Sequence, residues 1–360
     1  MESFLKLVAT DLYNRTQGDL AHTAVVFPNK RAGLFFNEHL AEQSDTPIWS
    51  PAYVSISELF RSLSTWEVGD PVKLVCELYK VFLHETQSKE TLDDFYFWGE
   101  MLISDFDDAD KNMVDTDNLF TNLQDLKNIM DDYTFLNNEQ EEAIQQFFQN
   151  FSIEKRTELK EKFISLWDKL GTIYHRYRAN LTELGIAYEG MLYRNVIEQL
   201  DTDQLKYDKY IFVGFNVLNK VENDFFRKLK DAGKALFYWD YDVFYTQQIK
   251  KHEAGEFLKR NLEEFPNELP ESFFDTFKEP KKIRSISAST ENAQARFLPE
   301  WIKMITDNHS QIAEEKEKEN AVVLCNEALL LPVLHSIPQE VKNVNITMGF
   351  PLAQTPVYSF

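Results

Sequence analysis

The chain has 360 residues, of which 43% are hydrophobic and 14% aromatic, and it carries a net charge of −21. This length allows two or three domains with cores of their own, and the composition excludes a disordered or fibrous protein. The acidity disfavours a broad surface that coats nucleic acid, although it leaves room for a narrow basic groove.

The charge is distributed unevenly along the chain. Residues 61–200 hold 14 Lys and Arg against 27 Asp and Glu, so they carry −13 of the −21. The simplest interpretation is a solvated acidic surface on helices. Cys76 and Cys325 form no metal-binding or redox motif, and no apolar run reaches the roughly 20 residues of a membrane span. We therefore expect a soluble, cytoplasmic protein with no membrane partner.

The first part of the chain, residues 1–59, predicts an α/β pattern. We expect a helix, a strand, a second helix and an extended segment at residues 3–15, 23–27, 31–40 and 48–55. Ser55 and Glu58 have the spacing of a capping box, which predicts that another helix starts there.

Residues 60–202 predict an α-helical insertion without a convincing strand. Asp70-Pro71 is a strong helix start, and apolar residues recur at spacings of three and four from 159 to 181, as in a helix bundle. The acidic stretch 104–110 could bind a divalent cation, but it lacks the glycine and the final carboxylate of an EF-hand. We expect it to form an acidic loop at a helix end.

Residues 203–280 begin with one α/β crossover unit and continue as a polar connection. A strand at 211–213, a helix and a strand at 235–239 follow one another within about 30 residues, which is typical of parallel strands. Asp240 and Asp242 follow the second strand, where catalytic acids often lie in α/β folds. Because no nucleophile or phosphate loop accompanies them, a turn or capping role is favoured.

Residues 281–360 predict the start of a further α/β domain. We expect strands at 283–287, 321–325 and 344–348, with helices between them. Pro299 lies within the first of these helices and predicts a kink or a first turn. We also expect the chain to be a fragment of a longer protein.

The sequence lacks a phosphate-binding loop of the GxxxxGK[ST] type. Its only Gly-Lys pair, Gly233-Lys234, lies between a helix and a strand, where a C-cap glycine is expected. The turn after the strand at 211–213 reads GFN and has no carboxylate for magnesium. We therefore expect no nucleotide hydrolysis, no catalytic residue and no cofactor in this segment.

Two groups of residues are candidates for contacts with DNA. Asn29, Lys30 and Arg31 follow a strand and open a helix, where side chains and N–H groups can meet a phosphate. Arg176 and Arg178 alternate with aromatic residues in the sequence YHRYR, as in proteins that bind single strands. Ordinary surface charge is the alternative explanation for both groups.

Five stretches, taken in order, resemble the N-terminal half of AddB/RexB-type subunits of bacterial helicase–nuclease complexes. More narrowly, they are similar to Bacteroidetes relatives in the PD-(D/E)XK nuclease superfamily. AVVFPNKRAGLFFNEHL resembles helicase motif Ia, PIWSPAYVSISELF the entry to a helical subdomain, and YDKYIFVGFNVLNKVENDFFRKLK the motif II/III unit. STENAQARFLPEWI with AVVLCNEALLLPVL resembles the opening of a second RecA-like domain, and NVNITMGFPLAQTPVYSF the stretch after it.

The resemblance implies an α/β fold of the degenerate superfamily 1 helicase type. A RecA-type parallel sheet would be built from residues 1–59 and 203–280, with a large all-α insertion at 60–202 and a partial second RecA-like domain at 281–360. The ATP-hydrolysing residues of active helicases are missing, so the implied module is non-hydrolysing. Of the residues in the matched stretches, Asn29, Lys30 and Arg31 would contact DNA.

The implied function is a DNA-binding scaffold module of an exonuclease for double-strand-break repair and recombination. Its partners would be DNA and an AddA-type helicase–nuclease motor subunit. Magnesium would belong to a nuclease domain expected beyond Phe360. The rival interpretation, favoured by the acidic helical block, is a protein-interaction scaffold that does not bind DNA.

Overall fold

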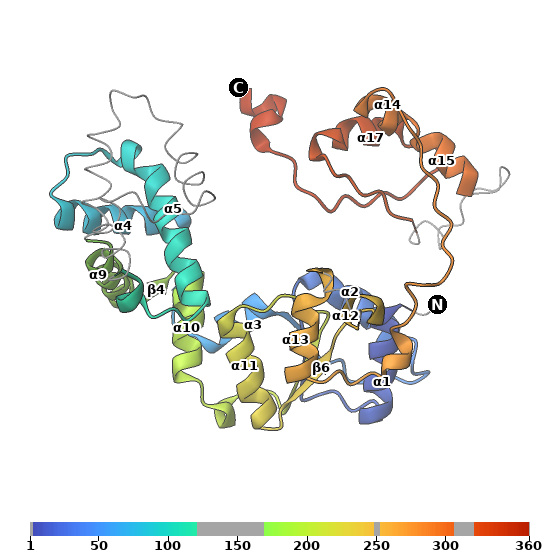
Figure 1. The fold of residues 1–360 in the computed structure, drawn as a ribbon, viewed down its shortest axis with the longest axis horizontal. Helices are drawn as coiled ribbons and strands as arrows, with labels where there is room; N and C mark the ends of the chain where they lie inside the picture. The colour runs from blue at the N-terminus through green and yellow to red at the C-terminus, as the bar shows by residue number, and fades with distance from the viewer. Residues whose placement is uncertain (1–2, 121–168, 248–252, 306–319, 360) are drawn as a thin grey trace. The chain divides into compact units, whose positions relative to one another are not determined.

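The computed structural model describes residues 3–120, 169–247, 253–305 and 320–359. The chain divides into two compact units, Met1–Glu279 and Pro280–Phe360 (Figure 1). The first unit combines a parallel sheet with a helical block, and the second contains short helices.

The first unit is built on a four-stranded parallel sheet. Its strands are β1 (Thr23–Phe27), β2 (Ala52–Ser55), β5 (Lys209–Val213) and β6 (Ala235–Tyr238), in the order β2-β1-β5-β6. Strands far apart in the sequence are direct neighbours, since Val25 pairs with Ile211 and Val26 with Phe212. The predicted α/β class and the predicted sharing of one sheet by these segments are therefore confirmed.

Side chains alternate between two apolar layers along each strand. One layer receives Ala24, Val26, Tyr210, Phe212 and Phe237. The other layer receives Val25, Phe27, Ile211, Val213 and Tyr238. Because both layers are apolar, the strands are buried on both faces, as parallel sheets require.

The two short crossovers place their helices on opposite faces of the sheet. α2 (Lys30–Ala41) leads from β1 outward to β2, whereas α11 (Lys220–Asp231) leads from β5 outward to β6, in the opposite direction. Connections of one hand that run in opposite directions must cover opposite faces. Accordingly, α1 (Phe4–Thr16) and α2 pack on one layer and α11 packs on the other.

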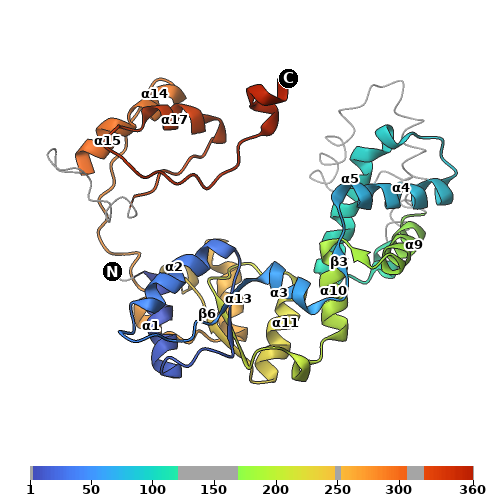
Figure 2. The ribbon, with the colours of Figure 1, turned by 180° about the vertical axis from the view of Figure 1, so that it is seen from behind.

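The helical block is an enlarged connection between β2 and β5. Its helices are α3 (Ile56–Leu63), α4 (Pro71–Thr86), α5 (Leu92–Lys111), α9 (Leu170–Glu183) and α10 (Glu189–Gln199). α10 runs beside α3 and α11 (Figure 2), so the apolar interior of the block continues into the layer under α11. The capping box predicted at Ser55 and the helix start predicted at Asp70 are confirmed.

Two details of the block differ from the prediction. β3 (Glu67–Val68) and β4 (Ile186–Ala187) form a two-stranded parallel pair where no strand was expected, because two-residue strands leave no periodic pattern. The stretch 104–110 is the last part of α5 and not a loop, because its apolar side, with Phe106, is buried. The predicted helix at 159–181 is described only from α9 onward; its earlier residues lie outside the described ranges.

Residues 243–247 and 253–279, which belong to the predicted polar connection, fold back onto the sheet. They include α12 (Val243–Thr246) and α13 (Glu256–Glu264). The Glu268 N–H donates to the carbonyl oxygen of Phe237 in β6 at 3.0 Å, and Phe265 is fully buried against the α11 layer. This segment therefore protects one edge of the sheet.

The second unit contains α14 (Glu291–Arg296), α15 (Leu298–Ile305) and α17 (Leu330–Ser336). Pro299 lies in the first turn of α15, as predicted. The strands predicted at 283–287, 321–325 and 344–348 are wrong, since the structure describes these segments without strand pairing. Among the described residues, no neighbouring strand packs beside their apolar side chains, and Val323 is 84% exposed.

Candidate nucleic-acid interface

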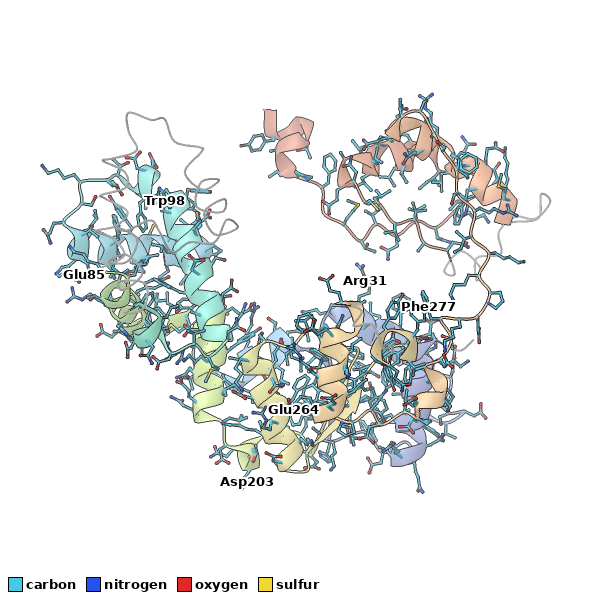
Figure 3. All side chains as sticks on the ribbon, viewed as in Figure 1. Arg31, Glu85, Trp98, Asp203, Glu264 and Phe277 are labelled. Atoms are coloured by element: carbon cyan, nitrogen blue, oxygen red, sulfur yellow. The ribbon has the colours of Figure 1, made fainter. Side chains whose placement is uncertain are left out.

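The sheet has a switch point between β1 and β5, because the chain leaves these strands in opposite directions. Ligands of open α/β sheets bind in the crevice outside the carboxyl ends of the strands at such a point. The turn after β1 carries Asn29 and leads into α2, and the turn after β5 carries Gly214, Phe215 and Asn216. The predicted residues Asn29, Lys30 and Arg31 therefore lie at this edge, and Arg31 is labelled in Figure 3.

These three residues have different roles at the start of α2. The Asn29 Oδ1 accepts hydrogen bonds from the backbone N–H of Arg31 at 3.1 Å and of Ala32 at 3.2 Å, so Asn29 is the N-cap. Lys30 forms an ion pair with Glu58 of α3. This contact lowers the pKa of Glu58 to about 2, helped by the hydrogen bond from the backbone of Ser55. The Arg31 guanidinium is exposed and makes no ion pair within the described residues.

Two other helices that start at this edge are also capped by side chains at their N-termini. In α3, Ser55 and Glu58 form a capping box, with the Ser55 N–H donating to Glu58 Oε2 at 3.0 Å. In α11, the Glu222 N–H donates to Asn219 Oδ1 at 2.8 Å and the Asn219 N–H donates to Glu222 Oε2 at 3.1 Å. The sequence already contained this second box, which the prediction missed.

The turn after β5 is anchored in the core. Gly214 adopts φ +73°, which permits its N–H to donate to the Tyr238 carbonyl oxygen at 2.9 Å. Phe215 is buried, with its ring centroid 5.3 Å from that of Phe226. The Asn216 carbonyl oxygen accepts from Asn261 Nδ2 at 2.6 Å. The turn therefore supplies a rigid wall without a carboxylate.

A turn or capping role was predicted for both acids after β6, and Asp242 has such a role. Asp242 is the N-cap of α12, accepting from the N–H of Phe244 at 2.8 Å, and its other oxygen accepts from the N–H groups of Thr276 and Phe277. Although burial opposes ionisation, these three hydrogen bonds lower the pKa of Asp242. Asp240, the other acid at this strand end, is exposed.

Arg176 and Arg178 lie on α9 in the helical block, and each forms an ion pair with a carboxylate. Arg176 forms an ion pair with Glu85, which is labelled in Figure 3, and lies 2.6 Å from His84 Nδ1. Arg178 contacts Asp110 at 2.9 Å and is mostly buried. The structure does not bring this pair together with the residues on α2, since the two groups belong to different layers of the unit.

Asp110 is the centre of a buried polar cluster that the sequence did not reveal. Its side chain is fully buried and accepts hydrogen bonds from Tyr174 at 2.6 Å and from Tyr188 at 2.5 Å. Arg178 and Arg194 supply two positive charges. Burial, with the nearby Asp110 carboxylate, raises the pKa of Tyr174 to about 12. The cluster is satisfied internally and joins helices α5, α9 and α10.

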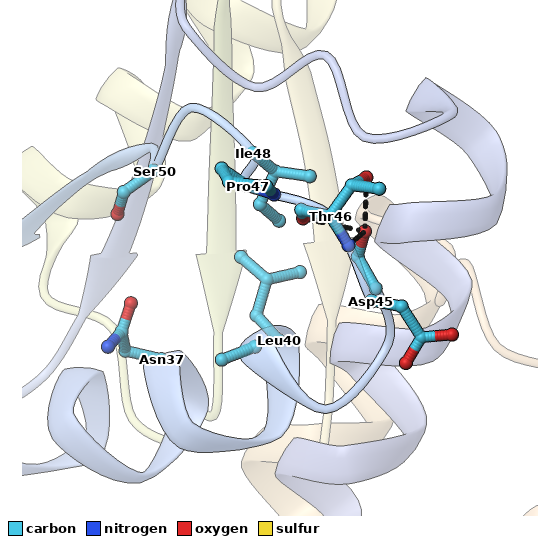
Figure 4. Close-up of a pocket in the computed structure, with 9 residues that line it drawn as sticks. Asn37, Leu40, Asp45, Thr46, Pro47, Ile48 and Ser50 are labelled. Atoms are coloured by element: carbon cyan, nitrogen blue, oxygen red, sulfur yellow. Dashed lines mark hydrogen bonds between the residues drawn. The ribbon is translucent and has the colours of Figure 1, made fainter.

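A cleft of about 400 Å³ lies at the other end of α2 (Figure 4). Leu40, Pro47 and Ile48 form apolar parts of its wall. The Ser44 hydroxyl donates to the Thr46 carbonyl oxygen at 2.9 Å, so these polar groups serve the loop itself. The lining offers no arrangement of acid, base and nucleophile.

The described residues contain neither a metal-binding cluster nor a membrane-spanning helix. In residues 3–120, 169–247, 253–305 and 320–359, no group of three or more His, Cys, Asp or Glu is placed to hold a metal ion. Within the same ranges, none of the helices has the length and apolar character needed to cross a bilayer.

These features define a class of fold. The four-stranded parallel sheet covered by helices on both faces is compatible with a Rossmann-like fold. A scan against protein-family models found no match, and neither did a search of curated proteins.

Proposed function

We propose that the chain is a non-hydrolysing, helicase-like DNA-binding scaffold module of a DNA double-strand-break repair exonuclease. In this proposal the parallel sheet is of the RecA type, the helical block is its insertion, and residues 281–360 begin a second RecA-like domain. Cutting with magnesium would take place in a nuclease domain beyond residue 360. An AddA-type motor subunit would supply the movement along DNA.

The proposal is supported by a contrast at the switch point. The helix starts there are capped by side chains, whereas the side chain of Arg31 is exposed. Side chains already cap α2, α3 and α11, and two of these caps bring the carboxylates of Glu58 and Glu222. A nucleotide phosphate needs open N–H groups and is repelled by carboxylates, so this arrangement disfavours nucleotide binding. Arg31 remains exposed beside them, where it can contact a DNA phosphate.

The outer side of α2 adds a second feature suited to DNA. Leu34 and Phe35 follow Arg31 and are 73% and 49% exposed. Exposed apolar and aromatic side chains beside a cation can contact unstacked bases of a single strand. A DNA phosphate could also take Lys30 from Glu58, since that ion pair is exposed to solvent and therefore weak.

A fluorescence titration with single-stranded and forked DNA at low salt tests the proposal. We expect the protein to bind, and we expect Arg31→Glu to weaken binding by about tenfold, through one lost phosphate contact and one added repulsion. Lys73→Glu is the matched control, because Lys73 is an exposed lysine of α4 with no ion pair among the described residues. Absence of binding, or equal loss in both variants, would overturn the proposal.

Calorimetry with ATP tests the non-hydrolysing part separately. We expect no heat of binding in the presence of magnesium, because side chains already cap the three helix starts and two of these caps bring a carboxylate. Saturable ATP binding would show that the sheet edge still accepts nucleotides.

The alternative function is a protein-interaction scaffold that does not bind DNA. The specific observation in its favour is that Arg176 and Arg178 are neutralised by Glu85 and Asp110. A protein that binds no DNA in the titration above, but still binds a partner protein, would support this alternative.

A further inference from the structure

The outer face of α5 combines acidic and apolar side chains. At its start, Asp94 Oδ2 accepts a hydrogen bond from the Thr91 hydroxyl at 2.7 Å, as part of the helix cap. Asp94, Phe97, Met101, Asp105 and Asp108 recur at spacings of three and four, so they share one side of the helix. The opposite side contains Phe95, Phe106 and Ala109, which are buried in the core. We refer to the first set as the α5 acidic stripe.

The α5 acidic stripe is exposed except at Met101, which is half-buried. Phe97 has 66% of its surface exposed, and the three aspartates are exposed as well. Phe97 touches the ring of its neighbour Trp98, with centroids 6.1 Å apart, but this contact leaves most of its surface open. The exposed part of the Phe97 ring therefore gains no stabilisation from hydrophobic burial.

The stripe also lacks positive charge. Asp105 and Asp108 form no ion pair within the described ranges, and Lys111, one turn further, is held by Asp107 at 2.7 Å and by Glu189 at 3.1 Å. The pKa of Asp105 is raised, first by partial desolvation of its carboxyl group and second by the Asp108 charge three residues away. Like charges three residues apart destabilise a helix, so the arrangement is costly for the isolated chain.

We infer that the α5 acidic stripe is a docking surface for a basic, amphipathic polypeptide segment of a partner protein. Such a segment would pair lysine or arginine side chains with Asp105 and Asp108 and cover Phe97 with an apolar side chain. Nucleic acid and anionic lipid surfaces are excluded as occupants by their own negative charge. The inference does not depend on DNA binding at the sheet edge.

The probe for the test is a synthetic amphipathic helical peptide of lysine and leucine, labelled for fluorescence anisotropy. We expect Asp105→Lys/Asp108→Lys to weaken its binding by about tenfold. Both substitutions place lysines in the last two turns of α5, where cations suit the helix dipole, so the variant should fold.

The matched control is Asp19→Lys/Glu263→Lys, which changes the net charge equally at two exposed acids outside the helical block. We expect it to change the affinity less than about threefold, since distant exposed charges are screened. Phe97→Ser tests the apolar part at constant charge and should weaken binding by about threefold to tenfold.

Three results would overturn the inference: no peptide binding by the wild type, equal loss in the two charge-reversed variants, or an unchanged affinity of the Phe97 variant. Equal loss would mean that the peptide responds only to net charge. Circular dichroism of each variant confirms that its helical content is preserved.

Discussion

The helical block and the carboxyl edge of the sheet both place arginine near acidic residues, but with different outcomes. In the block, Arg178 is mostly buried and contacts Asp110, while Tyr174 and Tyr188 complete the site. At the sheet edge, the neighbouring acids cap helices or pair with Lys30, and Arg31 remains exposed. The comparison indicates that the ion pairs and burial of an arginine decide whether it can contact a ligand. Its aromatic or basic neighbours in the sequence do not.

The largest effect expected from this comparison concerns the buried cluster. Asp110→Ala would leave two arginines without their shared carboxylate and two tyrosine hydroxyls without an acceptor. We expect a loss of about 3–5 kcal/mol in the free energy of unfolding, measured by urea denaturation. Asp108→Ala, an exposed position on the same helix, should change it by less than about 0.5 kcal/mol. Equal effects would contradict the structural role of Asp110.

The packing that supports the cluster can be tested at Gly190, where α10 meets α5. A Cβ atom there would lie 2.3 Å from the backbone carbonyl oxygen of Asp107. Gly190→Ala must therefore push the helices apart, and we expect a cost of about 1–3 kcal/mol in urea denaturation. Gly171→Ala in α9 is the control, because its Cβ would make ordinary contacts at 3.4 Å or more. A neutral Gly190→Ala would mean that the two helices are not closely packed.

At the sheet edge, the charge of Glu58 should make a smaller and pH-dependent contribution. Its pKa in the folded protein, about 2, lies below its ordinary value of 4.5. Ionised Glu58 therefore stabilises the fold above about pH 4.5, and this contribution is lost as the pH falls toward 2.

Glu58→Gln keeps the capping geometry but removes the charge. We expect it to cost at most about 1 kcal/mol at neutral pH, because solvent screens the pair, and to cost less as the medium becomes acidic. Unfolding curves at several pH values measure the difference. A cost that grows toward acidic pH would have the wrong sign for this account, and Glu183→Gln, on the exposed side of α9, gives the baseline.

The smallest effect on stability is expected at the exposed arginine. Arg31→Ala should change the free energy of unfolding by less than about 0.5 kcal/mol, whereas Arg178→Ala should cost more than about 2 kcal/mol. Thermal or urea denaturation of the two variants side by side checks this. Similar losses would show that Arg31 also serves the fold and is not held free for a ligand.

Local features of the fold could be predicted well from the sequence. Strands at 23–27 and 235–239 follow from runs of apolar residues, and the caps at Ser55, Asp70 and Gly233 follow from side-chain chemistry within a few residues. These signals are local because each depends on one turn or one strand.

Contacts between particular side chains that are far apart in the sequence could not be predicted. The Asp110 cluster combines residues from three helices, so nothing near residue 110 distinguishes it from an acidic surface. Likewise, 321–325 has the apolar character of a strand, but the structure gives it no paired neighbour. Of the candidate DNA-binding residues, sequence order placed Arg31 correctly at a helix start, yet it gave no sign that Arg178 is buried.

The salt dependence of DNA binding tests the central claim, that the sheet edge is closed to nucleotides but open to DNA through Arg31. Forked DNA would be titrated into the wild type and Arg31→Ala over a series of salt concentrations. The account predicts that the affinity falls with salt, and that the slope of log K against log salt is smaller by about one in the variant. Identical slopes, or no binding at the lowest salt concentration, would contradict it.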